Sequence, residues 1–386
     1  MTSLPSNLPA KLPSDKRLER WLLEYHLPFW LPRLQPDEQG YHLDLDHRGA
    51  PIHRVRTLRT VAQARTLWFC SRLSRSPYAS QASRDLARAG FDCLQQNFWD
   101  PVHAGVFWDI GQNQPQKHLY AQAFALFAFC EYATLSADER ALELAHQLFD
   151  RSEQCRDALY AGYLESRNRD WTPITTRGIS PIGAPHQEKT VNAHLHLLEA
   201  LTSYHGLTGR ATESLTALLN FLDGWTGGDR FSREGLRRDK LSCFGHQLEY
   251  IWLRGAALRS LKRQPVDAIS LAIFQRCQAG WDGCWGGYFE EPWRPWHWWR
   301  GKIWWVQAEA LLASLLLAQY PYAPAQLQLP RLMHWIEKHQ IDSRYLEWHA
   351  LSSRPLDNKA GPWKSPYHVG RCLLEGLSLL AGTGQT

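Results

Sequence analysis

Polar, ionisable side chains lie inside otherwise apolar stretches of this sequence. The segment VNAHLHLLEA (191–200) carries Asn192, His196 and Glu199 at spacings i, i+4 and i+7, so a helix would place all three on one face. His194 lies about 200° round the same helix from His196, and we interpret it as a structural histidine. An imidazole beside a carboxylate is a pair that can accept and return protons near neutral pH.

The segment CFGHQLEYIWL (243–253) places His246 and Glu249 three residues apart. This spacing binds metal ions in helical di-iron proteins, and His196 and Glu199 repeat it. Spacing alone therefore leaves a metal site open, with a structural ion pair that orients the imidazole as the alternative. We expect no metal, because the sequence lacks an aspartate-rich cluster and the surroundings are aromatic.

A third histidine stands in GPWKSPYHVGRC (361–372). His368 follows Ser-Pro-Tyr, so it should begin a helix. The helix dipole lowers the proton affinity of an imidazole at this end, which suits a base that works near neutral pH. A polar residue that starts a helix and has no further role is the alternative.

Two charged residues stand alone in apolar segments. Arg65 is the only charge in TVAQARTLWF (60–69), and a buried guanidinium needs an anion or an anionic transition state. Glu309 lies in GKIWWVQAEALL (301–312), close to several tryptophans. Its alternative interpretation is a buried salt bridge with Arg65 or with a histidine.

The elements that must position these groups are helices. Leu18, Trp21, Leu22 and Tyr25 follow the helical period after a cap at residue 14 or 15, and no long alternating strand pattern occurs. A turn followed by an aromatic residue returns every 56 to 68 residues. Its aromatic positions are Tyr41, Phe107, Tyr163, Phe231, Tyr288 and Tyr345.

Each interval in this series holds about two helices and their loops. Six helical hairpins predict an all-α protein with an (α/α)6 barrel, and a linear solenoid is the alternative. No linker rich in Pro, Gly or Ser divides the chain. We therefore expect a flexible tail over residues 1–13 and one catalytic domain over 14–386, with the site at the mouth where the loops gather.

Composition excludes several classes of protein. Among 386 residues, 44% are hydrophobic, yet no apolar run reaches the roughly 18 residues of a membrane helix. The first 13 residues hold three prolines and no apolar core of a signal peptide, so we expect a cytoplasmic protein. The net charge of +5 is spread out, with LRRDK (236–240) as the densest run, which argues against nucleic acid. Eight cysteines form no C-x-x-C pair and should be reduced.

Several of these segments together resemble one family. NAHLHLLEA, FGHQLE, KIWWVQAEAL and WKSPYH are similar to motifs of the N-acylglucosamine 2-epimerase superfamily, as are AQARTLW, KHLYAQAFALFAF and FWDPVHAGVFW. This superfamily includes cellobiose 2-epimerases, mannose 2-epimerases and mannose/glucose–fructose isomerases. The resemblance covers residues 18–380 in the same order, and it implies an (α/α)6 barrel.

The resemblance also implies roles for individual residues. His246 and His368 would be the acid/base pair, and His196 would be a third essential histidine. Arg65 would hold the reacting oxygens, while Glu249 and Glu309 would orient the imidazoles. The residues that would line the sugar site are Asn192, Tyr120, Trp305 and Trp363.

The function that follows is sugar 2-epimerisation. A free reducing aldose of the mannose/glucose type, or cellobiose, would react through a cis-enediolate without metal or cofactor, and aldose–ketose isomerisation at the same site is the alternative. The presence of His196 argues against an N-acetyl sugar, and the bulky EEPWRPWHWWRG (290–301) would restrict the mouth to a monosaccharide. A glycoside hydrolase using Glu249 and Glu309, or a sugar-binding protein without activity, are the rivals. We expect a monomer or homodimer with no nucleic-acid or membrane partner.

Overall fold

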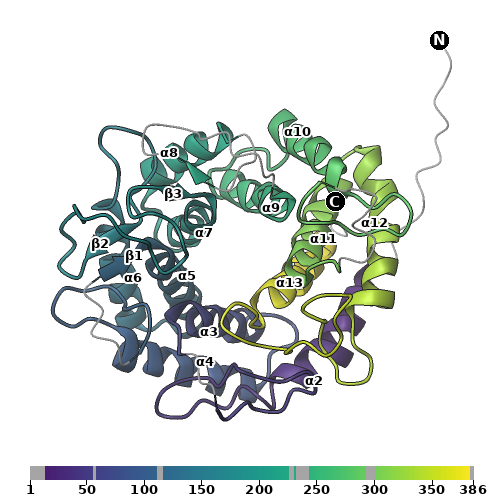
Figure 1. Cartoon of the computed structure of the whole chain (residues 1–386), viewed down its shortest axis with the longest axis horizontal. Helices are drawn as coiled ribbons and strands as arrows, with labels where there is room; N and C mark the ends of the chain where they lie inside the picture. The colour runs from purple at the N-terminus through teal and green to yellow at the C-terminus, as the bar shows by residue number, and fades with distance from the viewer. Residues whose placement is uncertain are drawn as a thin grey trace.

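The chain folds into two concentric rings of helices, seen end-on in Figure 1. The computed structural model describes residues 14–54, 58–110, 116–225, 230–231, 243–292 and 301–382. Each inner helix packs on the next one, and the last packs on the first, which closes the ring. The inner helices are α3 (Thr60–Ser74), α5 (Leu119–Ser136), α7 (Val191–Thr208), α9 (Phe244–Ser260), α11 (Trp304–Ala318) and α13 (Tyr367–Gly382). The closed ring confirms the (α/α)6 barrel and rejects the linear solenoid.

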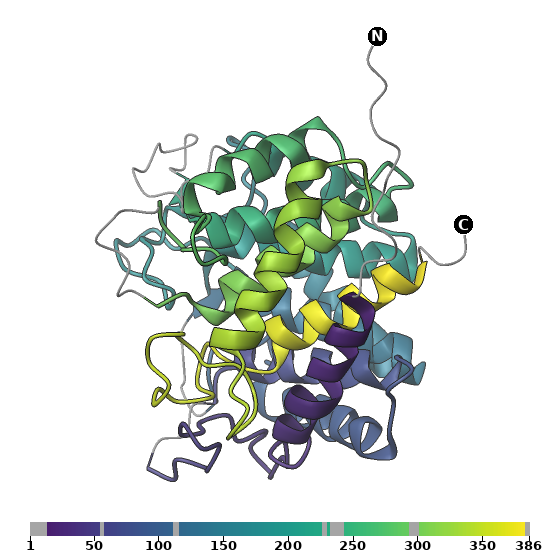
Figure 2. The ribbon, with the colours of Figure 1, turned by 90° about the vertical axis from the view of Figure 1, so that its right-hand side faces the viewer.

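An outer helix covers each inner one. The first outer element is continuous through α1 (Ser14–Arg20), the π-helical η1 (Trp21–His26) and α2 (Leu27–Trp30), as the spacing of Leu18, Trp21 and Leu22 predicted. The other outer elements are α4 (Gln81–Cys93) with η2 (Leu94–Phe98), α6 (Glu139–Glu153), α8 (Thr212–Asp223), α10 (Ala268–Cys277) with η3 (Gln278–Gly280), and α12 (Ala323–Trp335) with η5 (Ile336–Gln340). In the side view, α12 lies outside α11 and α13 (Figure 2).

Burial explains which helices form which ring. The inner α11 is buried from Val306 to Ala318 and is apolar apart from Gln307, Glu309 and Ser314, as expected for a helix surrounded by protein. The outer α6 buries one stripe that includes Leu144 and Leu148, and its other face is polar. Caps define the ends of the helices: Thr190 Oγ1 accepts a hydrogen bond from Ala193 N at the start of α7, and Gly209, at φ +71°, ends it.

The strands of the described residues are short and lie in the loops. β1 (Gln116–His118) pairs antiparallel with β2 (Ser166–Asn168), and β3 (Lys189–Thr190) pairs with β4 (Arg230–Phe231). Both β1 and β3 lead directly into inner helices, so they fix the direction in which α5 and α7 enter the barrel. The expectation that long strands are absent is confirmed for this part of the chain.

The repeated turn of the sequence is a structural clip. In four loops an aspartate accepts hydrogen bonds from the backbone two and three residues later and forms an ion pair with a lysine. The pairs are Asp100–Lys117, Asp157–Lys189, Asp282–Lys302 and Asp342–Lys359, with N–O distances of 2.8 to 3.0 Å. Each clip ties the loop that follows an outer helix to the segment before the next inner helix.

A second kind of contact also holds the loops: a polar side chain in the first turn of an inner helix forms hydrogen bonds with the backbone of a loop. Gln63, Gln122 and Gln307 each donate to and accept from one loop residue, as in the pair Gln307–Tyr288 at 2.7 and 2.8 Å. His194 occupies the equivalent place in α7, where its Nε2 accepts from Tyr163 N. Its structural interpretation is therefore confirmed.

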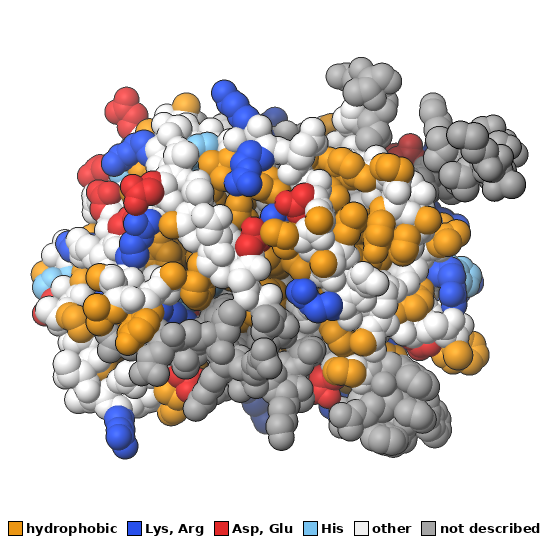
Figure 3. Space-filling view, turned by 90° about the horizontal axis from the view of Figure 1, so that it is seen from above, with side chains coloured by type: hydrophobic (Ala, Val, Ile, Leu, Met, Phe, Trp, Pro, Cys, Tyr) orange, Lys and Arg blue, Asp and Glu red, His pale blue; other side chains and the backbone are white. Residues whose placement is uncertain are grey.

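Other expectations concern the surface and the thiols. All eight cysteines are free, and six are buried. On the face drawn in Figure 3, acidic and basic side chains are interspersed rather than gathered into a patch of one sign. Among the described residues, no helix has both the length and the apolar character needed to cross a bilayer. The tail 1–13, LRRDK (236–240), the side chain of Phe231 and most of EEPWRPWHWWRG (293–300) lie outside the described residues.

Candidate active site

A cavity of about 220 Å³ opens at the end of the barrel where the inner helices begin. Most of its lining residues stand in the first two turns of the inner helices, which Figure 1 shows around the ring. All of the predicted site residues line this cavity except Glu309, which lies behind it. The lining residues are Arg65, Tyr120, Asn192, His196, His246, Glu249, Trp304, Trp305, Trp363 and His368.

Two of the histidines contact one tryptophan. The ring of Trp305 lies 5.1 Å from the ring of His246 and 5.8 Å from that of His368, centroid to centroid. His246 is the third residue of α9, and His368 is the second residue of α13, as its position after Ser-Pro-Tyr predicted. The Nδ1 atom of His246 is buried and has no hydrogen-bond partner among the described residues.

Glu309 fixes the orientation of His368. Its Oε1 lies 2.6 Å from His368 Nδ1, and both groups are buried. A carboxylate at this distance holds the imidazole proton on Nδ1 and leaves the lone pair of Nε2 as the acceptor. The orienting role predicted for Glu309 fits this contact, whereas a salt bridge between Glu309 and Arg65 is not formed.

Arg371 joins three carboxylates beneath the cavity, and sequence reasoning missed it. Its Nη2 donates to Glu249 and to Glu309, each at 2.6 Å, and its Nη1 donates to Glu199 and to the hydroxyl of Tyr367. The guanidinium is buried, so the three carboxylates supply the negative charge that it requires. The available signal was its place three residues after His368, on nearly the same face of one helix.

This network sets the charge of Glu199. Burial alone would raise the pKa of Glu199, but Arg371 and the hydrogen bond from His196 outweigh it and lower that pKa to about 2. Glu199 Oε2 lies 3.0 Å from His196 Nδ1 and also accepts from Tyr367. His196 is therefore oriented by an ionised carboxylate on its own helix, as the shared stripe of α7 indicated.

Glu249 does not have the partner that its spacing predicted. It binds Arg371, and its nearest imidazole is His196, whose Nε2 lies 3.9 Å away. A shared helix face brings His246 and Glu249 close, but the buried guanidinium attracts the carboxylate more strongly than a neutral ring does. The ion pair between His246 and Glu249, offered as the alternative to a metal site, is not formed, and His196 is the imidazole nearest to this carboxylate.

The imidazoles differ in pKa from the near-neutral value expected. Burial lowers the pKa of His196 and of His246 to about 4. For His368, burial and then the positive charge of Arg65 lower the pKa well below 6.5. Desolvation rather than the helix dipole is the main cause. All three rings are neutral at neutral pH in the free protein and can act as bases.

Arg65 presents a cation to the cavity without a carboxylate partner. Its Nη2 donates to Tyr120 Oη at 2.9 Å and its Nη1 donates to the carbonyl oxygen of Trp363 at 3.3 Å. Its Nε is buried without a hydrogen-bond partner in the described part of the chain, where no ion pair of Arg65 occurs either. The guanidinium also lies 4.3 Å from the ring centroid of Phe124. A positive charge held in this way is available to an anion in the pocket.

Three of these groups could be considered as metal ligands. Glu249, Glu309 and His368 offer atoms that all lie within 4.8 Å of one another. Arg371 already donates to both carboxylates, however, and supplies the positive charge that a metal would bring. The second His-x-x-Glu pair, at His196, does not join this cluster. The donor set therefore fits a guanidinium better than a metal ion.

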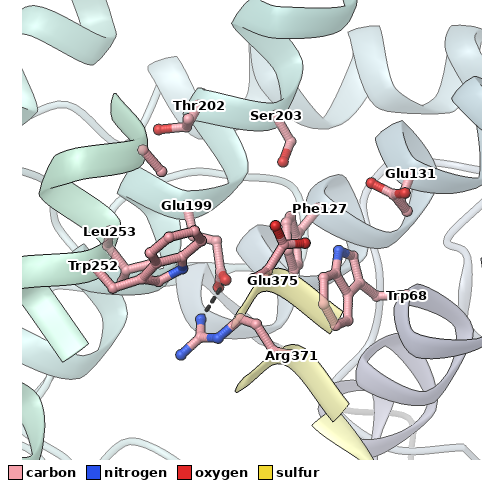
Figure 4. A pocket seen from close by; sticks show the side chains of 11 residues that line it. Trp68, Phe127, Glu131, Glu199, Thr202, Ser203, Trp252, Leu253, Arg371 and Glu375 are labelled. Carbon is pink, nitrogen blue, oxygen red and sulfur yellow. Dashed lines mark hydrogen bonds and ion pairs between the residues drawn. The ribbon is translucent and has the colours of Figure 1, made fainter. Parts of the chain in front are cut away.

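A second cavity, of about 150 Å³, lies on the far side of the same ion network. Figure 4 shows Arg371 and Glu199 at its floor, with Trp68, Phe127 and Trp252 around them. The side chains at its rim, such as Thr202 and Ser203, come from later turns of the inner helices. One layer of charged residues thus separates the two cavities along the barrel axis.

The closed double ring of helices and its tryptophan-lined, polar cavity define the class of (α/α)6-barrel proteins with a pocket at one end. Within this class, the chain belongs to the N-acylglucosamine 2-epimerase (GlcNAc 2-epimerase) family, which it matches over residues 40–372. It is 28% identical to the cellobiose 2-epimerase of Ruminococcus albus over 92% of this chain and 96% of that one. It is 32% identical to the N-acylglucosamine 2-epimerase of Bos taurus over 91% and 87%.

Solved structures agree with this assignment. The cellobiose 2-epimerase from Spirochaeta thermophila is 25% identical and superposes with a TM-score of 0.82 over 98% of this chain and all of that one. A D-mannose isomerase has the same fold, with a TM-score of 0.79 at 18% identity, over 96% of this chain and all of that one. The chain is therefore an isomerase that acts on carbohydrates.

Proposed function

We propose that this protein epimerises a free reducing aldose at C2 by metal-independent proton transfer through a cis-enediolate. The observation that carries the proposal is the pair of neutral imidazoles, His246 and His368, which both contact Trp305 and line one cavity with Arg65. Two bases and one cation are the groups that this reaction requires.

The chemistry begins with ring opening, because the C2–H bond becomes acidic only beside the C1 carbonyl. One imidazole then removes the C2 proton, and the resulting enediolate carries negative charge on its oxygens. Arg65 is the group we assign to that charge, since its planar fork can contact two oxygens. The imidazole that took the proton can return it to C1, whereas return to the opposite face of C2 comes from the other imidazole, which must first take up a proton from solvent.

The two imidazoles should differ in strength. Glu309 accepts from Nδ1 of His368 and would stabilise the imidazolium that forms when Nε2 takes a proton. His246 has no such partner among the described residues, so it would hold a proton less firmly and give it up more readily. We assign His368 as the stronger base and His246 as the group that acts on the opposite face of C2, with His196 as a third essential histidine.

Delivery of the second proton decides the product. Return to C2 from the opposite face gives the epimer, whereas return to C1 gives the ketose. The same residues serve both outcomes, so aldose–ketose isomerisation, such as mannose to fructose, is the alternative activity of this site. The curated relatives named cellobiose 2-epimerase and N-acylglucosamine 2-epimerase favour the epimer.

The substrate should be a mannose or glucose unit with a free 2-hydroxyl, alone or at the reducing end of a disaccharide such as cellobiose. Trp305 and Trp363 offer aromatic faces to the C–H surface of the sugar. Trp363 is 40% exposed, so one edge of the site remains open to solvent, where a second sugar ring could extend. Asn192 and Tyr120 supply polar contacts to the hydroxyls.

The test is incubation with mannose, glucose, fructose and cellobiose, followed by chromatography and mass spectrometry of the products. We expect an isomer of unchanged mass that differs at C2. Release of a monosaccharide from cellobiose would instead support the glycoside hydrolase with Glu249 and Glu309. Binding without any product would support a sugar-binding protein.

A further inference from the structure

Four loops of the barrel share one type of turn, and the same position of this turn is glycine in three of the loops and glutamate in the fourth. The backbone N–H of the clip aspartate donates to the carbonyl five residues later: Asp100 to Gly105, Asp157 to Gly162, Asp282 to Gly287 and Asp342 to Glu347, at 2.8 to 3.0 Å. The acceptor residue has a positive φ in every case, between +62° and +86°. Glycine occupies this position in three turns, and Glu347 occupies it in the fourth.

A glutamate at this position strains the backbone. A left-handed φ is natural for glycine but strained for a residue with a Cβ. Leu346, directly before Glu347, is left-handed as well, at φ +65°. Such strain persists where the surrounding structure holds it, and it is frequent at functional sites. The benefit must therefore come from the side chain of Glu347.

That side chain connects three separate segments. Glu347 is fully buried, and its carboxylate accepts from His26 Nδ1 at 2.7 Å, from Trp30 Nε1 at 3.0 Å and from Lys364 Nζ at 3.0 Å. Burial would raise the pKa of Glu347, but Lys364 and His26 outweigh it and lower that pKa. The carboxylate is thus ionised and tied to the first outer helix on one side and to the segment before α13 on the other.

Lys364 leads to the candidate active site. It is buried, also donates to the carbonyl oxygen of Lys359 at 2.9 Å, and lies 5.9 Å from the ring of Trp304 in the cavity wall. Its neighbour Trp363 lines the cavity, and the Trp363 carbonyl accepts from Arg65. The ordinary clip of this loop, Asp342–Lys359, is already present. Glu347 and Lys364 are therefore an additional pair, which the other described loops lack at this position.

We infer that Glu347 is a positioning residue for the sugar site. Glu347 fixes the segment 359–366 through its ion pair with Lys364. Trp363 is thereby kept at the cavity, where its carbonyl oxygen accepts a hydrogen bond from Nη1 of Arg65. The assigned role of Trp363 and Arg65 rests on the proposed function. The strained turn is retained because glycine would supply the backbone shape but no anchor.

Four variants test this inference: Glu347→Gln, Lys364→Met, the double variant, and Leu346→Gly as the control. The control removes the partly buried leucine side chain from the other left-handed position of the same turn, so it changes packing and backbone freedom there but touches neither charge. We expect Glu347→Gln and Lys364→Met each to lower kcat/KM by about 10- to 100-fold, the scale of a displacement of about 1 Å in a site. The double variant should lose no more than either single one, because both changes release the same anchor.

Hydrogen exchange measured by mass spectrometry gives a readout that does not need turnover. Peptides covering 359–366 should exchange faster in both charge variants and at the wild-type rate in Leu346→Gly. If the wild type shows no turnover, the proposed function is wrong, but the hydrogen-exchange rates of the variants can still be compared with those of the wild type. Glu347→Gln with kcat/KM within about threefold of wild type, losses that multiply in the double variant, or no folded Glu347 variant at all would each overturn the positioning role.

Discussion

Glu309 holds His368 through a hydrogen bond of 2.6 Å to Nδ1, and the same carboxylate accepts from Arg371 through its other oxygen. The imidazole is thus linked to a buried cation by a single carboxylate. Burial raises the pKa of Glu309, and Arg371 opposes that rise. The proton affinity of His368 should therefore depend on the negative charge of Glu309 and not only on the shape of the Glu309 side chain.

The first prediction concerns that charge. Glu309→Gln keeps the volume but removes the anion that stabilises a protonated His368, so kcat should fall by at least about tenfold, part of the 10²–10⁴ that an oriented acid/base group supplies. Steady-state kinetics on the best sugar measures this. Glu375→Gln is the matched control, because Glu375 lies about two turns after His368 in the middle of α13 and pairs with Arg72 rather than with an imidazole. Equal activity of both variants would remove Glu309 from the mechanism.

The second prediction is the pH profile. The imidazole that removes the C2 proton must be neutral, and burial lowers the pKa of His246 to about 4, with His368 also well below 6.5. The neutral form therefore persists below the usual titration of histidine, and kcat/KM of the free enzyme should stay constant from pH 7 to about 5.5 and fall only nearer pH 4. Initial rates over this range, with the fold checked by circular dichroism, test it. A fall in kcat/KM centred near pH 6.5 would mean that the imidazoles are solvated and keep the ordinary pKa of histidine.

The third prediction separates catalytic from structural histidines. His246→Ala and His368→Ala should each lose about 10²- to 10⁴-fold in kcat, because each change removes a proton carrier. His194→Gln should keep activity within about twofold, since glutamine holds the equivalent place in three other inner helices. Kinetics and far-UV circular dichroism are needed for all three. Retention of more than a tenth of kcat in either alanine variant would end the two-base assignment.

Part of the candidate site could be predicted from the sequence alone. The stripe of Asn192, His196 and Glu199 was readable because helical spacing alone sets which residues share a face. Arg65 and Glu309 were readable because a charge in an apolar segment must be compensated. In each of these cases the signal lies within one helix.

The central partner, Arg371, carried no such signal. Its carboxylates lie 172, 122 and 62 residues away along the chain, on three other inner helices. Spacing within α9 suggested that Glu249 would serve His246, but only the closed ring shows that Arg371 takes it. The lowered pKa values were equally hidden, because they depend on burial from all sides.

The fourth prediction concerns the oxyanion contact. Arg65→Lys should lower kcat/KM by about 10²-fold or more, because an ammonium cannot contact two oxygens in the plane of a guanidinium and also keep Tyr120 and the Trp363 carbonyl as partners. Arg72→Lys serves as the control on the same helix. Normal kcat/KM in Arg65→Lys would move the enediolate contact to another residue.

The last prediction follows the hydrogen itself. Imidazole protons exchange with water, so turnover in D₂O should place deuterium at C2 of the epimer, or at C1 if a ketose forms. A metal-assisted hydride shift would carry the original hydrogen across and incorporate little deuterium. Because Arg371 already balances Glu249 and Glu309, we expect full activity after exhaustive EDTA treatment. Nuclear magnetic resonance of the product and assays before and after chelation measure both. Activity lost to EDTA and restored by a divalent ion, with no deuterium uptake, would overturn the proton-transfer mechanism and the roles assigned to His196, His246 and His368.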